Sequence, residues 1–235
     1  MSGKEDGLPE TDAMSIVEDA FAPLEGRRLL DIGCGAGNFA RSLAARGARV
    51  AGVDPNPEAL AVARESVSTG TFLAARAEAL PFVDASFDGA VLINSLHHVP
   101  KPAMDRALRD AARVVVPSGF VVVVEPLAEG SFFLALRPVE DETEVRTAAQ
   151  EVLVRAVASG TLDQLRRVDY LRHERFEDME GFLDRVVAVD PARAALVARN
   201  RPEVEAAFSR YASVAPDGGV ALDQPMRAHV LKART

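Results

Sequence analysis

Short apolar runs, which predict buried strands, alternate along the first half of the chain with segments whose apolar residues recur at helical spacing. The apolar runs are RRLLDIG, ARVAGVD, GTFLAARAEAL, FDGAVLINSL and GFVVVVEPL. The helical segments are DAMSIVEDAFAPL, NFARSLAARG, NPEALAVARESV and PAMDRALRDAARVV. Such alternation is typical of a doubly wound α/β sheet, in which ligands bind at the carboxyl ends of parallel strands.

Local signals place some helix ends. Gly47 is expected to stop the helix over NFARSLAARG, because glycine tolerates the left-handed conformation that follows a helix. Asn56 is expected to cap the next helix, with Pro57 at its first position.

The second half of the chain has a different pattern. DETEVRTAAQEVLVRAVASG predicts a long amphipathic helix, RVDYLRHERF a strand, residues 178–215 mostly helix, and MRAHVLKA a strand that closes the sheet. The segment AEGSFFLALRPVED, residues 128–141, is apolar and aromatic but contains Gly130 and Pro138, so we expect it to fold over another part of the molecule.

Composition narrows the class of protein. With 235 residues, of which 48% are hydrophobic, the chain can bury one sizeable core. Its formal net charge of −8 disfavours a nucleic-acid partner and favours a small-molecule substrate. The single cysteine, Cys34, fits a reducing compartment.

Because we find neither a leader-like start nor an uninterrupted apolar segment of membrane-spanning length, we expect a cytoplasmic protein without membrane insertion. Whether it forms a homo-oligomer stays open.

A glycine loop follows the first strand. Gly33, Gly35 and Gly37 alternate in LLDIGCGAGNFA, which lets the backbone approach a ligand closely. The dinucleotide-binding fingerprint needs glycine at the sixth position, where this chain has Asn38. Asp31 ends the strand before the loop, and its charge would repel a pyrophosphate but attract an ammonium or sulfonium group. The loop therefore favours a cationic ligand.

Asp54 ends the second strand, where its two oxygens can accept hydrogen bonds from both hydroxyls of a ribose. This role is shared with nicotinamide-dependent enzymes and does not by itself separate the two ligand classes.

The segment LLDIGCGAGNFARSLAARGARVAGVDPNPEALAVARE resembles motif I and the acidic loop of the class I S-adenosylmethionine-dependent methyltransferases. AEALPFVDASFDGAVLINSLHHV and ARVVVPSGFVVVVEP resemble the later motifs of the small-molecule branch that includes the ubiquinone and menaquinone methyltransferases. The match covers residues 27–126.

The resemblance implies an α/β Rossmann-like fold of seven strands in the order 3-2-1-4-5-7-6, with the last strand antiparallel. It implies one methyltransferase domain over 1–235, with an N-terminal helical cap (1–24), a cofactor-binding core (25–126) and a lid, helical insertion and closing strands (127–235). It also implies an S-adenosyl-L-methionine-dependent transferase of EC class 2.1.1, with S-adenosyl-L-homocysteine as product and no metal. The cofactor residues that it implies are Asp31, Gly33, Cys34, Gly35, Asp54, Pro55, Asn56, Ala77, Glu78 and Asn94.

One residue departs from the pattern of this family. Where many relatives have an aspartate facing the adenine amino group, this chain has Arg76, which offers only donors. We expect Glu78 or a water molecule to take that contact. Cys34 is interpreted as a small loop residue, because a thiolate there would have no evident partner.

Three polar residues near the ends of the fourth and fifth strands are candidates for catalysis. His97 or His98 could deprotonate a substrate hydroxyl near neutral pH, or one could pack inward while the other binds a loop carbonyl. Glu125 could contact the substrate or anchor a loop.

Candidate substrate contacts come from the segment after the fifth strand. Phe132, Phe133 and Arg137 could form a lid, although aromatic residues in such a segment also serve as core. Most arginines of the second half are expected on solvated helix faces, and Arg137 is the one we expect to pair with a substrate carboxylate. These arginines are Arg137, Arg146, Arg155, Arg166, Arg167, Arg172 and Arg175.

Three functions compete. The first is methyl transfer to an O, N or C atom of a small molecule by in-line displacement. The segment NSLHHV lacks an Asn/Asp-Pro-Pro-aromatic signature, which argues against methylation of adenine or glutamine amino groups. The second is an NAD(P)-dependent oxidoreductase, which Asp54 supports and Asp31 and Asn38 weaken. The third is a non-methylating relative that binds the same cofactor.

Overall fold

The computed structural model describes residues 8–9, 11–215 and 218–233. The chain forms two compact units. The core unit comprises Thr11–Glu125, Ala148–Val168 and Arg227–Thr235, and the helical unit comprises Met1–Glu10, Pro126–Thr147 and Asp169–Met226. Residues 1–7 and 10 of the expected N-terminal cap lie outside the described residues.

The sheet has the predicted order. Its long strands are β1 (Arg28–Ile32), β2 (Arg49–Asp54), β3 (Thr71–Ala74), β4 (Phe87–Ile93), β5 (Val115–Pro126), β6 (Leu162–Phe176) and β8 (Val220–Ala233). They follow the order β3-β2-β1-β4-β5-β8-β6, with β1 to β5 parallel and β8 antiparallel to β5. Numbered without the short β7 (Ser213–Val214), this is the expected order 3-2-1-4-5-7-6. The sequence did not predict β7, which pairs antiparallel with β8.

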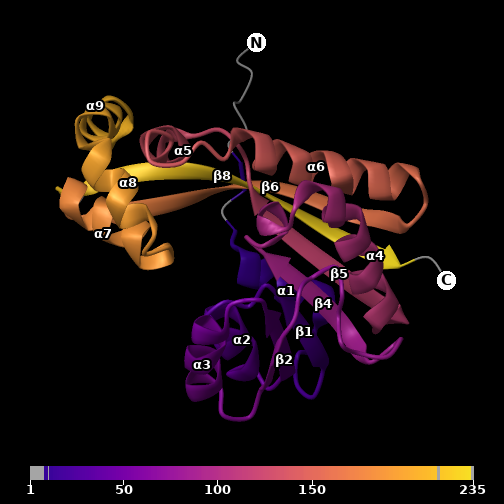
Figure 1. The fold of residues 1–235 in the computed structure, drawn as a ribbon. Helices are drawn as coiled ribbons and strands as arrows, with labels where there is room; N and C mark the ends of the chain where they lie inside the picture. The colour runs from indigo at the N-terminus through magenta and orange to yellow at the C-terminus, as the bar shows by residue number, and fades with distance from the viewer. Residues whose placement is uncertain (1–7, 10, 216–217, 234–235) are drawn as a thin grey trace. The chain divides into compact units, whose positions relative to one another are not determined.

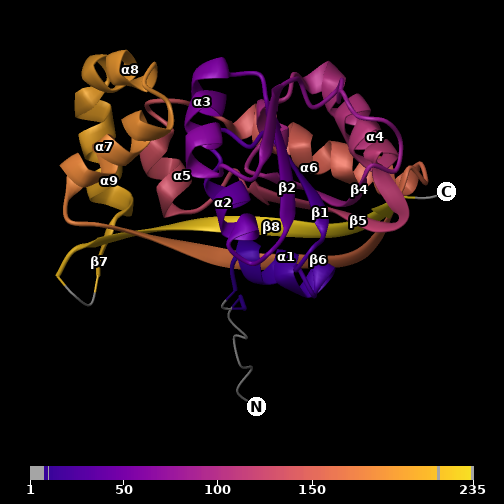
Figure 2. The ribbon, with the colours of Figure 1, turned by 90° about the horizontal axis from the view of Figure 1, so that it is seen from below.

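The helices that flank the strands of the core unit also match the apolar pattern. They are α1 (Ala13–Phe21), α2 (Asn38–Ala44), α3 (Pro57–Ser66), α4 (Met104–Val114) and most of α6 (Thr143–Ala158), with 3₁₀ turns η1 (Leu96–His98) and η2 (Lys101–Ala103). Figures 1 and 2 show α2 and α3 grouped beside β2, and α4 beside β4 and β5. Over the described residues, no helix combines the length and the hydropathy that crossing a bilayer requires.

Both faces of the central strands are covered, which explains why their sequences are apolar without a gap. On one face, Ala90 and Leu92 of β4 belong to a cluster with buried residues of α4 and α6. On the other face, Gly89 leaves room for Phe21 of α1, since a Cβ added at Gly89 would lie 2.1 Å from the ring of Phe21. Phe21 also contacts Phe120, with ring centroids 6.2 Å apart.

The predicted cap of α3 is confirmed. The Asn56 side chain accepts hydrogen bonds from the backbone N–H groups of Glu58 and Ala59, at 2.9 and 3.3 Å, and Pro57 is the first helical residue. Helix α2 ends at Ala44, earlier than predicted, and Gly47 follows in the left-handed region at φ +87°.

The helical unit contains α5 (Ser131–Leu136), α7 (Met179–Val189), α8 (Arg193–Arg199) and α9 (Arg201–Tyr211), which lie together in Figures 1 and 2. Phe182 and Phe208 stand at the centre of its apolar cluster, with ring centroids 5.4 Å apart. Residues 178–215 are mostly helical, as the sequence predicted.

We predict that Phe21→Ala lowers the free energy of unfolding by about 3–5 kcal/mol, because it leaves a cavity over Gly89 and removes the contact with Phe120. Equilibrium denaturation in urea measures the change. Val62→Ala on α3, whose side chain is 49% exposed, is the control and should change stability by less than about 0.5 kcal/mol. Equal losses in the two variants would contradict the packing described for α1.

Candidate functional site

The ends of the parallel strands converge at one edge of the core sheet. The register aligns Asp31 of β1 with Gly52 of β2 and Val91 of β4, and Ile93 of β4 with Val124 of β5. The segments that follow these strands therefore gather at the same edge. They are the glycine loop 33–37, residues 54–56, residues 94–98 and Glu125.

Hydrogen bonds tie the glycine loop to the end of β2. The backbone N–H groups of Gly33 and Cys34 donate to the carbonyl of Val53, at 2.8 and 3.0 Å. Asp54 accepts from Gly35 N at 2.9 Å on Oδ2 and from Asn56 N at 2.8 Å on Oδ1. Each carboxylate oxygen of Asp54 retains a lone pair with which it could accept from a ligand hydroxyl.

Two glycines of the loop have different surroundings. Gly33 and Gly35 both have positive φ, +76° and +51°. A Cβ added at Gly33 would lie 2.5 Å from Cβ of Ser95, so this glycine lets the loop pack against the segment after β4. A Cβ added at Gly35 would have no atom within 4 Å. Gly35 therefore borders open space, into which a ligand can fit.

Asp31 is buried at this edge, with 2% of its surface exposed. Its Oδ2 has no hydrogen-bond partner among the described residues. Burial raises the pKa of Asp31 to about 7, with a small contribution from the charge of Asp54, against the opposing effect of a hydrogen bond from the Ala40 backbone. A positively charged group placed beside Asp31 would favour its ionised form.

Asn94 supplies a second unsatisfied acceptor. It takes the left-handed conformation at φ +52°, and its backbone N–H donates to the carbonyl of Val124 at 2.8 Å. Its Oδ1 is buried without a partner in the described part of the chain. Buried polar atoms are rarely left unpaired in folded proteins, so Asn94 Oδ1 and Asp31 Oδ2 are the atoms best suited to a ligand that brings donors or positive charge.

Cys34 lies in the loop with 8% of its surface exposed. Burial raises the pKa of its thiol far above the ordinary value, and the charges of Asp31 and Asp54 raise it further. A neutral thiol is a poor nucleophile, in keeping with our interpretation of Cys34 as a small loop residue.

The residues expected at the adenine end are more exposed. Pro55 is exposed, and Ala77 and Glu78 are partly exposed after β3. Arg76, the residue that departs from the family pattern, lies with Nη1 3.8 Å from Oε1 of Glu78. The acceptor that we expect for the adenine amine is thus already beside a guanidinium group.

Glu125 is fully buried at the end of β5, and its carboxylate accepts hydrogen bonds from the turn after β4. His97 is also buried, and its Nδ1 is hydrogen-bonded to Glu125. His98 is exposed, and its ring centroid lies 4.0 Å from that of His97. The structure thus brings the three catalytic candidates together, and Glu125 anchors a loop, as one of the two alternatives foresaw.

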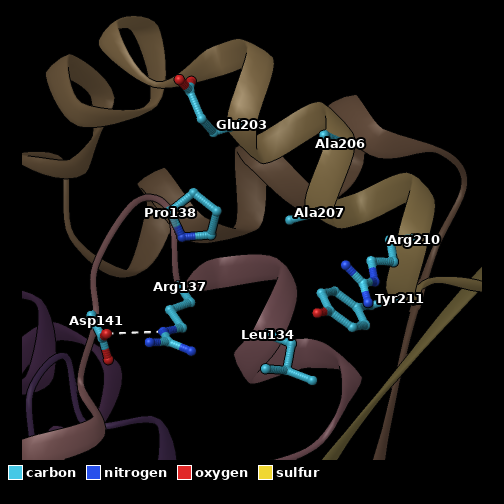
Figure 3. Close-up of a pocket in the computed structure, with 9 residues that line it drawn as sticks. All are labelled: Leu134, Arg137, Pro138, Asp141, Glu203, Ala206, Ala207, Arg210 and Tyr211. Atoms are coloured by element: carbon cyan, nitrogen blue, oxygen red, sulfur yellow. Dashed lines mark hydrogen bonds and ion pairs between the residues drawn. The ribbon is translucent and has the colours of Figure 1, made fainter.

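The three candidate substrate residues lie in the helical unit, in different surroundings. Phe133 is buried, with the guanidinium of Arg146 4.9 Å from its ring centroid, and Phe132 packs against Phe176 and Phe182. Arg137 instead lines an open pocket of about 480 Å³ between α5 and α9 and binds Asp141 through Nε at 2.9 Å. Figure 3 shows Arg137 there with Leu134 and Tyr211. Neither phenylalanine lines this pocket.

Arg146 is an exception to the expectation that most of these arginines lie on solvated helix faces. It is only 5% exposed. It binds Glu142 through Nε and Nη2, at 2.9 and 2.6 Å, and donates to Oε1 of Gln224 at 2.9 Å. Glu142 also binds Arg193 at 3.1 Å, so its charge is shared by two arginines. Glu142 is four residues before Arg146, but Gln224 and Arg193 are distant in sequence, so helical periodicity could not reveal that they bury this group.

The sequence reasoning also missed Ser95. Its Oγ donates to the carbonyl of Ile32 at 2.7 Å, which links the end of β1 to the turn after β4, and its Cβ position requires glycine at residue 33. The only signal in the sequence is a small polar residue directly after Asn94.

The fold is Rossmann-like, and the buried acceptors at its strand ends form a candidate ligand site. Residues 30–123 match the family model described as "Methyltransferase domain". The chain is 40% identical over 112 residues to a ubiquinone biosynthesis O-methyltransferase of Paracidovorax citrulli, covering 44% of this chain and 45% of that protein. A second relative with the same description, from Paraburkholderia phymatum, is 34% identical over 169 residues, or 70% of this chain and 65% of the relative.

A solved structure described as the [4+2]-cyclase SpnF has the same fold, with a TM-score of 0.64 and 21% identity over 97% of this chain and 87% of its own. These similarities support assignment to the class I small-molecule methyltransferases. The chain spans about half the length of the first curated relatives that it matches.

Asp31 should make the stability of the ligand-free protein depend on pH. Because its folded-state pKa is about 7 against an ordinary 3.8, the folded protein retains a proton that the unfolded chain has lost between about pH 4 and 7. The contribution of Asp31 to stability therefore falls as pH rises through this window, with a slope approaching about 1.4 kcal/mol per pH unit. Urea denaturation of wild type and Asp31→Asn between pH 4.5 and 8 measures it as the difference between the two.

Asp88→Asn is the control, because its partner Arg28 lowers the pKa of Asp88. The contribution of Asp88 is present above its ordinary pKa of 3.8 and is lost only at lower pH, so the wild-type minus Asp88→Asn difference should stay flat between pH 4.5 and 8. A wild-type minus Asp31→Asn difference that stays flat with pH would contradict the assignment of a raised pKa.

Proposed function

We propose that this protein transfers the methyl group of S-adenosyl-L-methionine to a small-molecule acceptor by in-line displacement. The observation that carries the proposal is the pair of buried, unpartnered oxygens, Asp31 Oδ2 and Asn94 Oδ1, at the edge where Gly35 borders open space. Two acceptors suit the ammonium and sulfonium of this cofactor, whereas a pyrophosphate would be repelled. The matches to the methyltransferase family support the same choice over an NAD(P)-dependent oxidoreductase.

The remaining assignments belong to this proposal. Asp54 would accept the ribose hydroxyls, Pro55 and Asn56 would lie beside the adenine, and Ala77 and Glu78 would lie at its edge. Gly33 and Cys34 would supply backbone to the methionine moiety. The division into an N-terminal cap, a cofactor-binding core to residue 126 and a lid beyond it is part of the same proposal, as are Phe132, Phe133 and Arg137 as lid residues.

The cofactor, when bound, supplies an activated methyl group whose transfer leaves a neutral thioether. The residues of this chain would then act mainly by orientation, which can lower a barrier by about 7–11 kcal/mol in well-aligned systems. Asp31 and Asn94 would fix the charged end of the ligand, and Asp54 the ribose. A base among His97 and His98 would be needed only for an acceptor that is protonated at the working pH.

Calorimetric titration with S-adenosyl-L-methionine, S-adenosyl-L-homocysteine and NADH tests the choice of ligand, and Asp54→Ala tests the site. We predict micromolar binding of the first two ligands alone, and an affinity at least about tenfold weaker in Asp54→Ala, because a charged acceptor of two hydrogen bonds is lost. Asp105→Ala alters a partly exposed carboxylate on α4, away from these strand ends, and should bind like wild type. Binding of NADH alone would refute the proposal.

Gly35→Val should abolish binding of S-adenosyl-L-homocysteine in a protein that still folds, because its side chain would enter the space reserved for the ligand. The matched control is Gly26→Val, since Gly26 also has a positive φ (+73°) and no atom within 4 Å of an added Cβ, but precedes β1. Both variants carry the same kind of backbone strain. If Gly35→Val binds like Gly26→Val, the ligand lies elsewhere.

A second candidate function is cofactor binding without methyl transfer. It is favoured by the similarity in fold to a protein described as a [4+2]-cyclase, which shows that this architecture is compatible with another reaction. Mass spectrometry of a metabolite extract incubated with the protein and S-adenosyl-L-methionine separates the two, because only a methyltransferase yields a product heavier by a methyl group together with S-adenosyl-L-homocysteine.

A further inference from the structure

The carboxylate of Glu125 accepts hydrogen bonds from the backbone N–H groups of three consecutive residues of the turn after β4, and it is also hydrogen-bonded to one imidazole nitrogen. Oε1 accepts from the backbone N–H groups of Ser95 and Leu96, at 3.0 and 2.8 Å. Oε2 accepts from the backbone N–H of His97 at 3.3 Å and is hydrogen-bonded to Nδ1 of the same residue. Glu125 has no exposed surface, so these donors replace its hydration.

This arrangement favours one position for the proton on His97. The oxygens of Glu125 accept from backbone N–H groups, which suits an ionised carboxylate, and an ionised carboxylate can only accept. Nδ1 of His97 would then carry the proton that it shares with Oε2. In the neutral imidazole Nε2 then has a free lone pair and is the nitrogen that can accept a proton.

The Nε2 atom is available for that role. The hydrogen bonds of His97 within the described residues all run to Glu125. Among the described residues, Asn94 Oδ1 of the same turn is a buried atom without a partner, but Nε2 of His97 is not. It therefore retains contact with solvent, although His97 as a whole is 5% exposed.

We infer that Glu125 is a positioning residue that holds His97 with its proton on Nδ1, so that Nε2 serves as the base for a hydroxyl-bearing acceptor. This inference rests on the proposed function. The acceptor oxygen would form its bond to the methyl carbon as the bond from carbon to sulfur breaks, and the hydroxyl proton would pass to Nε2. The resulting imidazolium would keep its Nδ1–H bond to Glu125, whose negative charge stabilises it.

The inference narrows the class of substrate. An acceptor that reacts as a neutral amine would not need a base held in one tautomer. A hydroxyl group needs one, because its oxygen becomes strongly nucleophilic only as its proton leaves. A small molecule with a phenolic or similarly acidic hydroxyl is therefore the acceptor that this pair fits.

Glu125→Gln is the informative variant, because the amide has one oxygen and one donor group. If its oxygen keeps the Ser95 and Leu96 N–H bonds, its NH₂ faces Nδ1 of His97 and can only donate to it. The proton of the imidazole must then move to Nε2. Glu142→Gln, which alters another carboxylate that is 5% exposed, is the matched control, and it should leave His97 unchanged.

Long-range ¹H–¹⁵N NMR of the ligand-free protein tests the inference directly, with His97→Gln to assign the signals among the four histidines. We expect the proton on Nδ1 of His97 in the wild type and in Glu142→Gln, and on Nε2 in Glu125→Gln. A wild-type His97 protonated on Nε2 would overturn the inference. This wild-type measurement stands even if Glu125→Gln does not fold.

Carbethoxylation by diethyl pyrocarbonate, mapped by mass spectrometry, tests whether Nε2 is accessible. We expect modification of His97 in the wild type and at least about fivefold less in Glu125→Gln, because a protonated Nε2 does not react. An unreactive wild-type His97 would overturn the base assignment. Neither measurement uses the cofactor, so a failed titration with S-adenosyl-L-homocysteine refutes the proposed function without deciding the state of His97.

Discussion

A buried carboxylate must find hydrogen-bond donors, and this requirement shapes the edge of the sheet where the site lies. An ionised carboxylate moved out of water without partners costs several kcal/mol, even after the protein relaxes. Glu125 meets the requirement by drawing three successive N–H groups of the turn after β4 onto its oxygens. That turn must then bend sharply, and Asn94 adopts a positive φ just before it. The position of Asn94 Oδ1 thus depends on a residue of the neighbouring strand.

Three carboxylates at this edge have different partners. Both oxygens of Glu125 have hydrogen-bond partners within the turn after β4. Asp54 accepts one backbone hydrogen bond on each oxygen, whereas Oδ2 of Asp31 has no partner among the described residues. A fully partnered carboxylate is suited to holding other residues in place. A carboxylate with an unpartnered oxygen is suited to a ligand, and burial raises the pKa of Asp31, which a positively charged ligand group would offset. The different roles proposed for these three carboxylates follow from their hydrogen bonds rather than from their residue type.

Periodicity and local signals predicted most of the fold. Apolar runs located the long strands, and Asn56 with Pro57 located the start of α3, because these signals act within a few residues. The burial of Arg146 and the contact between Gly33 and Ser95 depend on residues far away in the sequence, and no local pattern encodes them. For the same reason the sequence placed Glu125 near the site but left its role open. Its four hydrogen bonds appear only when β4 and β5 lie side by side.

The fold alone does not determine the reaction, since a protein described as a cyclase shares it. The acceptors at Asp31, Asn94 and Asp54 concern the ligand and would serve a methyltransferase and a non-methylating relative equally. The pairing of His97 with Glu125 is different, because binding S-adenosyl-L-methionine requires no proton acceptor. The base that we infer at His97 would act only if a proton leaves a second molecule. This pair is therefore the feature of the core unit that argues for chemistry on an acceptor rather than for cofactor binding alone.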